Sequence, residues 1–141
     1  MLPRMITVLL VDDYPAMRQL LRDILERYHD IQVIGEAPTG EEAVMLAEAL
    51  IPAVVIIDIQ LPTLTGIEAT TLIKRKCPLT TVIALTAGAS EITESAMRDA
   101  GAATVLSKAD LLNMLYPAII EECMVAKIAA HTGVSVLSSS E

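Results

Sequence analysis

Reactive polar side chains follow four of the apolar runs in this sequence, each at the point where the run ends. They are Asp12 and Asp13 after the first run, Asp58 after the third, Thr86 after the fourth, and Ser107 and Lys108 after the fifth. Any one of them could be an ordinary polar residue that enters a loop. Carboxyl groups that share one site repel each other, however, and their charge is costly unless a cation offsets it. The set therefore predicts a cation site.

The residue types indicate which cation and which chemistry. Magnesium prefers oxygen ligands and keeps several waters, which suits Asp12, Asp13 and Asp58. Zinc would require His or Cys, and neither follows these runs. A metal ion and the Lys108 ammonium can offset the charge of a transferring phosphoryl group, while the Thr86 hydroxyl donates to one of its oxygens. The reaction indicated is attack by an Asp carboxylate on phosphorus, which yields an aspartyl phosphate.

Five short apolar runs must position these side chains. They are Ile6–Val11, Ile31–Ile34, Val54–Ile57, Val82–Leu85 and Ala103–Leu106. The runs are rich in Val and Ile and do not alternate with polar residues, which is typical of strands buried on both faces of a parallel sheet. The second run is the one that ends without a reactive side chain.

Helical patterns separate the runs. The expected helices are one with an apolar stripe over Met17–Tyr28, one that opens at Thr39, one from Thr65 to Cys77, one over Ser90–Ala100, and one from Ala109 or Asp110 to Ala130. The fourth has few large apolar residues, so we expect it to be the most loosely held. Pro117 lies inside the fifth, where proline removes a backbone hydrogen bond, so we expect a kink or a break there.

The alternation of strands and helices predicts an α/β fold of the (βα)5 type. Parallel strands joined by right-handed crossovers give a doubly wound sheet with helices on both faces. A barrel of eight such units needs about 250 residues, which the 141-residue chain does not have. In a doubly wound sheet, ligands bind beyond the carboxyl ends of the strands. The reactive side chains occur at those ends.

The composition limits the partners. At 53% hydrophobic and 20% charged residues the chain is not broadly disordered, and its length fits one domain. The net charge of −8 makes direct nucleic-acid binding and attachment to anionic membranes unfavourable. The apolar runs are too short to span a bilayer. Cys77 and Cys123 form no paired motif, which fits a reducing compartment. We therefore expect a cytoplasmic protein.

Four segments together resemble the CheY-like receiver domain of bacterial two-component response regulators. They are residues 8–13 (VLLVDD), 55–62 (VIIDIQLP) followed by Thr65-Gly66, 84–87 (ALTA) and 106–108 (LSK). The resemblance covers about residues 5–125, and residues 34–43 are further similar to receivers of LuxR-type regulators. It implies a flavodoxin-like fold with strand order 2-1-3-4-5. We also expect a receiver domain over residues 1–125 and a helix end and Ser-rich tail over residues 126–141, with no output domain. This organisation fits a stand-alone receiver or a piece of a longer regulator, and the sequence does not separate the two.

The resemblance also implies a role for each site residue. Asp58 would be the phosphoacceptor, and its donor a phosphohistidine on a sensor histidine kinase or a phosphotransfer protein. Asp13, Asp58 and the Gln60 carbonyl would ligate Mg²⁺, with Asp12 acting directly or through a metal-bound water. Thr86 and Lys108 would bind the phosphoryl oxygens. Such a chain catalyses only its own phosphorylation and dephosphorylation and is otherwise not an enzyme.

One position departs from the family pattern. Receivers commonly carry an aromatic residue three positions before the lysine, and Val105 stands there in this chain. The relay between that ring and the threonine is therefore in question, whereas the phosphoryl chemistry is not, because the ring makes no bond to phosphate. We expect the switch to involve Thr86, Ala87 and Val105.

Other classes of protein that handle phosphoryl groups require different motifs. A haloacid-dehalogenase-type phosphatase expects Asp two residues after the nucleophile, where this chain has Gln60, and a P-loop hydrolase needs a motif that is absent. The serious alternative is a degenerate receiver that acts as a non-phosphorylated protein-interaction module. The last helix carries apolar residues on more than one face, so we also expect a homodimer through it.

Overall fold

The five apolar runs form one parallel sheet. The computed structural model describes residues 5–132, and its strands are β1 (Ile6–Val11), β2 (Ile31–Ala37), β3 (Val54–Asp58), β4 (Thr81–Thr86) and β5 (Thr104–Ser107). Their order is β2-β1-β3-β4-β5, which confirms the predicted topology. All residues of β3 and β4 are buried. This burial on both faces explains why the runs do not alternate with polar residues.

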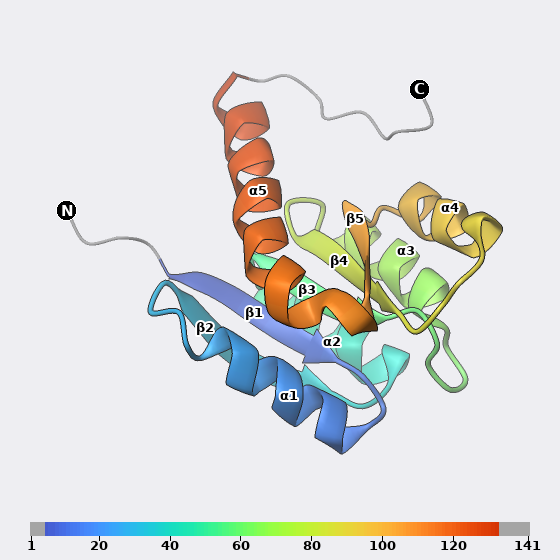
Figure 1. Cartoon of the computed structure of the whole chain (residues 1–141). Coiled ribbons are helices and arrows are strands. Elements are labelled where there is room, and N and C mark those ends of the chain that lie inside the picture. Colours follow the sequence, from blue (N-terminus) through green and yellow to red (C-terminus); the bar gives the residue numbers. More distant parts are fainter. Residues whose placement is uncertain (1–4, 133–141) are drawn as a thin grey trace.

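Five α-helices and one short 3₁₀ helix connect and follow the strands (Figure 1). They are α1 (Pro15–Leu25), α2 (Gly40–Leu50), α3 (Gly66–Lys76), α4 (Glu91–Asp99), η1 (Lys108–Asp110) and α5 (Leu111–Thr132). The hydroxyls of Thr39, Thr65 and Ser90 each accept a hydrogen bond from a backbone N–H in the first turn of α2, α3 and α4. These side chains satisfy amides that a helix start leaves without partners.

The helices cover both faces of the sheet. Apolar residues of α2, α3 and α4 pack on one face, against Leu9, Val55 and Val82 among others. Residues of α1 and α5 pack on the opposite face, against alternate strand positions such as Leu10 and Ile56. The site at the carboxyl ends of the strands is therefore held by two separate apolar layers.

The strand ends differ from the predicted bounds in a way that matters for the site. Asp58, Thr86 and Ser107 are the last residues of their strands and not the first residues of loops, so the sheet fixes their backbones. β2 runs three residues beyond the predicted end and includes Glu36, whose partner on β1 is Leu10. The second strand thus also brings a charged residue toward this end of the sheet.

The prediction of a kink or a break at Pro117 is wrong as to the break, whereas the kink stays a prediction. α5 continues through this residue as a single helix. Leu115 and Ile119 flank the proline and are completely buried in the core. Packing on both sides of Pro117 compensates for the hydrogen bond that its missing N–H cannot make, since tertiary packing supplies most of the stability of a protein helix. The predicted Ser-rich tail lies outside the described residues.

The fourth helix buries few residues, as its composition indicates, and its being the most loosely held stays a prediction. Met97 is the buried residue of α4, whereas Ile92 on the same helix is 83% exposed. Gly101 follows the end of the helix with a φ of +120°, a conformation that favours glycine. None of the helices within residues 5–132 combines the length and apolar content needed to cross a membrane.

Gly66 allows the closest approach in the loop between β3 and α3. A Cβ atom at this position would collide with the carbonyl oxygen of Asp58 and would lie 2.7 Å from Cα of Ile59. The Gly66 N–H donates to the Ile59 carbonyl at 2.9 Å. The start of α3 is thereby packed directly against the backbone of Asp58.

Candidate functional site

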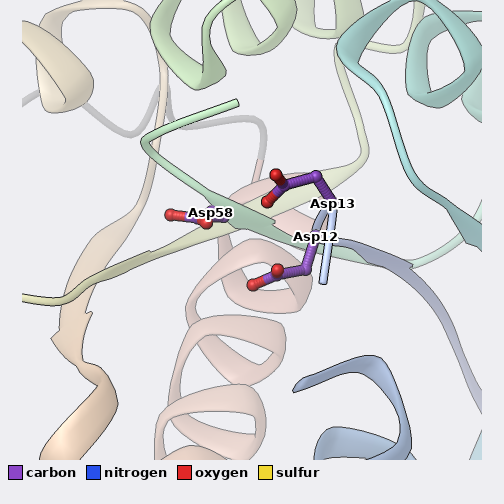
Figure 2. Close-up of side chains that lie close together, drawn as sticks. All are labelled: Asp12, Asp13 and Asp58. Carbon is purple, nitrogen blue, oxygen red and sulfur yellow. The ribbon is translucent and has the colours of Figure 1, made fainter. Parts of the chain in front are cut away.

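Three carboxylates meet at the carboxyl edge of the sheet. Asp12 and Asp13 follow the last residue of β1, and Asp58 ends the neighbouring strand β3 (Figure 2). One oxygen from each lies within 4.8 Å of the others. Asp12 and Asp58 are buried, whereas Asp13 is exposed. Two of the carboxylates are therefore fixed inside the fold, and the third faces solvent.

Lys108 lies between the two buried carboxylates. Its Nζ atom is 3.1 Å from Asp12 Oδ2 and 3.1 Å from Asp58 Oδ2. Burial acts to lower the pKa of Lys108, but its hydrogen bonds to the two carboxylates and their negative charges outweigh burial, so the pKa is raised. The ammonium is charged at neutral pH and offsets part of the acidic charge.

The environment of Asp58 disfavours its ionised form. Burial raises the pKa of Asp58, and the charge of Asp12 acts in the same direction. Hydrogen bonds from the Gln60 N–H and from Lys108 lower it, but burial is the larger effect. An ionised carboxylate in such surroundings gains more from a nearby cation than a solvated one does.

The four reactive strand ends share one local structure. In each, a side-chain oxygen accepts a hydrogen bond from the backbone N–H two residues further on, as in Asx and Ser/Thr turns. The four pairs are Asp12 with Tyr14 at 2.9 Å, Asp58 with Gln60 at 3.0 Å, Thr86 with Gly88 at 3.0 Å, and Ser107 with Ala109 at 3.2 Å. Each of these residues thus also directs the chain away from the sheet.

Thr86 anchors the loop between β4 and α4. Its hydroxyl oxygen accepts a second hydrogen bond, from the Ala89 N–H at 2.6 Å. A hydroxyl group has two acceptor positions and one donor hydrogen, so two accepted bonds leave its hydrogen for another group. Thr86 lies next to Leu85, whose strand partner is Asp58.

The remaining predicted residues surround this cluster. Gln60 is exposed and contributes its N–H to Asp58, and a metal contact of its carbonyl stays a prediction. Ala87 is exposed at the start of the β4–α4 loop. Val105 is half-buried on β5 and packs against the apolar layer under α2, α3 and α4. It fills space there without a polar group.

The cluster fits a hard divalent cation. Its three potential ligands are carboxylate oxygens, and the group contains no His or Cys. Asp13 is exposed, so one side of the cluster is open to water. Magnesium binds proteins through a few carboxylates and keeps several of its waters. The donor set and the open side match that preference.

Three charged residues beside the cluster were missed by the sequence analysis. Arg18 and Arg22 of α1 both bind Glu36 of β2, with N···O distances of 2.9 and 2.7 Å. The hydrogen bond from Arg22 lowers the pKa of Glu36 more than burial raises it. Arg18 also donates to the backbone carbonyl of Asp12 at 2.7 Å. Arg18 and Arg22 are four residues apart, so they lie on one face of the helix. This spacing would have indicated a shared acidic partner if the predicted second strand had included Glu36.

Comparison with known proteins places this arrangement in one family. Residues 8–119 match the response regulator receiver domain. The chain is 42% identical over 110 residues to a protein-glutamate methylesterase/protein-glutamine glutaminase of Thermotoga maritima, which covers 77% of this chain and 32% of that protein. It is 36% identical over 115 residues to response regulator GacA of Pseudomonas protegens, which covers 82% and 54%.

Solved structures agree with this match. The response regulator domain of Thermotoga maritima CheB has a TM-score of 0.75 at 35% identity and covers 87% of this chain and 96% of that one. A two-component response regulator of the LuxR family from Aurantimonas sp. SI85-9A1 has a TM-score of 0.81 at 28% identity, covering 85% and 86%. The chain belongs to the response regulator receiver domain family of two-component systems. It spans about a third to a half of the length of these two curated relatives.

Substitution of Lys108 by Met tests the electrostatics of the cluster. The variant leaves two buried carboxylates without their shared cation, so we expect the free energy of unfolding in metal-free buffer to fall by roughly 3 kcal/mol. Urea denaturation measures the change. Lys76→Met is the control, because Lys76 pairs with Glu48 on the surface at 3.2 Å and such pairs contribute about 1 kcal/mol or less. Equal losses in the two variants would contradict the role given to Lys108.

Proposed function

We propose that this receiver accepts a phosphoryl group on Asp58 from a phosphohistidine of a sensor histidine kinase or a phosphotransfer protein. The observation that carries the proposal is the convergence of three carboxylates with one lysine at the end of the sheet. In this proposal Asp12, Asp13, Asp58 and the Gln60 carbonyl hold Mg²⁺.

The charges in the cluster support a metal-dependent reaction. Three carboxylates and one ammonium leave two negative charges without compensation. An incoming phosphoryl group is also anionic, so its approach to Asp58 is unfavourable in the bare site. Bound magnesium would offset these charges and polarise the phosphoryl oxygens. Asp13, which is exposed, can take part without a large rearrangement of the core.

The transfer itself requires a nucleophile and partners for the phosphoryl oxygens. A carboxylate oxygen of Asp58 attacks phosphorus, and the bond between phosphorus and the donor imidazole nitrogen breaks. The electron pair stays on that nitrogen, which takes up a proton. Lys108, already 3.1 Å from Asp58, pairs with a phosphoryl oxygen, and Thr86 donates its free hydrogen to another.

The signal passes from Thr86 to the loop that it anchors. A phosphoryl group adds about −1.5 to −2 charge and strong acceptor oxygens. Attraction of the Thr86 hydroxyl alters its bonds to the Gly88 and Ala89 amides, which begin the loop into α4. Because α4 has little buried surface, it is the element that a small force can shift. Val105 stands where receivers commonly carry an aromatic residue, so this route does not depend on a ring at that position.

The chain acts in this proposal as a signalling phosphoacceptor and not as an enzyme on other substrates. The Thermotoga maritima relative is an esterase by name, but this chain covers only 32% of it. The alternative, a degenerate receiver that only binds proteins, does not require an acidic cluster or its lysine. The presence of both supports phosphoryl chemistry.

Treatment with acetyl phosphate and Mg²⁺ tests the proposed reaction. We expect the intact mass to increase by one phosphoryl group. The adduct should be lost at alkaline pH, and it should not form when the metal is chelated before the phosphoryl donor is added. Asp58→Asn should abolish the adduct while keeping the oxygen that accepts from Gln60, so that the turn survives. Glu41→Gln, a change at an exposed position of α2, serves as the control. Absence of an adduct with acetyl phosphate and with phosphohistidine donors would leave the interaction-module alternative.

Thr86→Ala should separate acceptance of the phosphoryl group from the structural response. The variant keeps Asp58 and Lys108, so we expect an adduct, although the amide shifts of residues 87–99 on phosphorylation should shrink several-fold. Thr86→Ser keeps the hydroxyl and should restore those shifts. Two-dimensional NMR of the three proteins with a phosphoryl mimic measures the effect. Shifts of full size in Thr86→Ala would contradict the proposed route.

We propose in addition that two copies associate through α5. Leu112, Met124 and Val125 on this helix are between 40% and 59% exposed, so the fold leaves several large apolar side chains of one helix uncovered. A second copy of the same surface gives a symmetric contact that covers them. Sedimentation velocity should show a dimer that is weakened by Met124→Glu. A monomer at all concentrations, with and without phosphoryl donor, would refute this.

A further inference from the structure

We propose that Arg18 is a positioning residue for the phosphoacceptor site. Its guanidinium, itself oriented by Glu36, holds the peptide between Asp12 and Asp13 so that both carboxylates converge on Asp58. The inference rests on the proposed function, since it concerns the same cation site.

Arg18 makes two contacts that point in different directions. Its Nη1 donates to the backbone carbonyl of Asp12 at 2.7 Å, and its Nε donates to Glu36 Oε1 at 2.9 Å. Hydrogen bonds from a charged group are shorter and stronger than those between neutral groups. The contacts therefore connect three elements, namely the end of β1, the first turn of α1 and the end of β2.

The peptide that Arg18 holds carries both adjacent carboxylates. The backbone N–H of Asp12 donates to the Ala37 carbonyl at 3.2 Å, and the backbone carbonyl of Asp12 accepts from Arg18. Both backbone polar groups of Asp12 are thus hydrogen-bonded. Rotation of the following peptide would swing the Cα–Cβ bond of Asp13 away from Asp58.

The carboxylate of Asp13 would be displaced most by such a rotation. Within residues 5–132 its carboxylate has no hydrogen-bond partner, whereas those of Asp12 and Asp58 each accept from a backbone amide and from Lys108. The position of Asp13 is therefore set by its backbone. α1 has no side-chain cap at Tyr14. Its start is joined to the strand end by two contacts of Asp12, whose carboxylate accepts from the Tyr14 N–H and whose carbonyl accepts from Arg18.

Arginine has the shape that this role requires. Its planar guanidinium presents donors along fixed directions, and so it can bridge a carbonyl and a carboxylate at once. A lysine ammonium at the same position is a point charge on a flexible chain and does not impose that geometry. The proposed role therefore depends on the planar geometry of the Arg18 guanidinium and not on its positive charge alone.

Arg22 provides a matched comparison one helical turn later. It donates through Nε and Nη2 to the other oxygen of Glu36, at 2.9 and 2.7 Å. In the described part of the chain it makes no hydrogen bond to Asp12. Removal of either arginine thus breaks an ion pair with the same carboxylate, but only removal of Arg18 releases the peptide.

The test compares Mg²⁺ binding by Arg18→Gln and Arg22→Gln in the whole chain, measured by isothermal titration. Loss of a residue that orients metal ligands typically weakens metal binding by about 10–100-fold. We expect Arg18→Gln to weaken Mg²⁺ affinity by about tenfold, and Arg22→Gln to leave it close to that of the unmodified chain. Urea denaturation in metal-free buffer should show that both variants fold. Arg18→Gln should lose somewhat more stability, because it loses its bond to the Asp12 carbonyl as well as its Glu36 contact.

The Arg18→Lys variant keeps the positive charge but not the planar geometry of the guanidinium. It also replaces Arg18→Gln in the test if that variant folds poorly. We expect its Mg²⁺ affinity to remain well below that of the unmodified chain. Recovery of full affinity with lysine, or equal affinities in Arg18→Gln and Arg22→Gln, would overturn the inference. Phosphorylation of the unmodified chain by acetyl phosphate is measured in a separate experiment. If it binds Mg²⁺ but forms no adduct, the proposed function fails while the comparison of the two arginines still decides the role of Arg18.

Discussion

The contact of one ammonium with two buried carboxylates is the interaction on which the rest of this structure depends. Lys108 directly follows β5, at the edge of the sheet. Asp12 directly follows β1, and Asp58 is the last residue of the neighbouring strand β3. Without the lysine, the two acids would be buried beside one another with no counter-charge, which costs several kcal/mol. With it, they can stay ionised and lie close enough for a cation to bind.

Much of the fold and of this cluster could be predicted from the sequence, because both follow from position along strands. Runs such as Val54–Ile57 are continuous and apolar, which indicates a parallel sheet buried on both faces. Parallel strands have their carboxyl ends on one edge, so Asp13, Asp58 and Lys108 had to lie near one another once the order of strands was known. The type of each side chain then indicated the chemistry.

What could not be predicted depends on contacts between elements that no local pattern contains. Glu36 looked like a residue after a strand, because β2 was expected to end at Ile34, and its pairing with α1 depends on how that helix crosses the sheet. Pro117 looked like a helix breaker, because local propensity does not include the burial of Leu115 and Ile119. The direction of the Thr86 hydroxyl is likewise set by the path of the following loop.

The turns at the strand ends have a consequence for how this protein could change over evolutionary time. Asp58 both offers the oxygen for chemistry and accepts the amide hydrogen that bends the chain after β3. A lineage that no longer needed the chemistry would still need the bend, and asparagine satisfies it as well as aspartate does. Descendants that have lost the phosphoryl chemistry should therefore retain a small amide or hydroxyl side chain at this position more often than an apolar one.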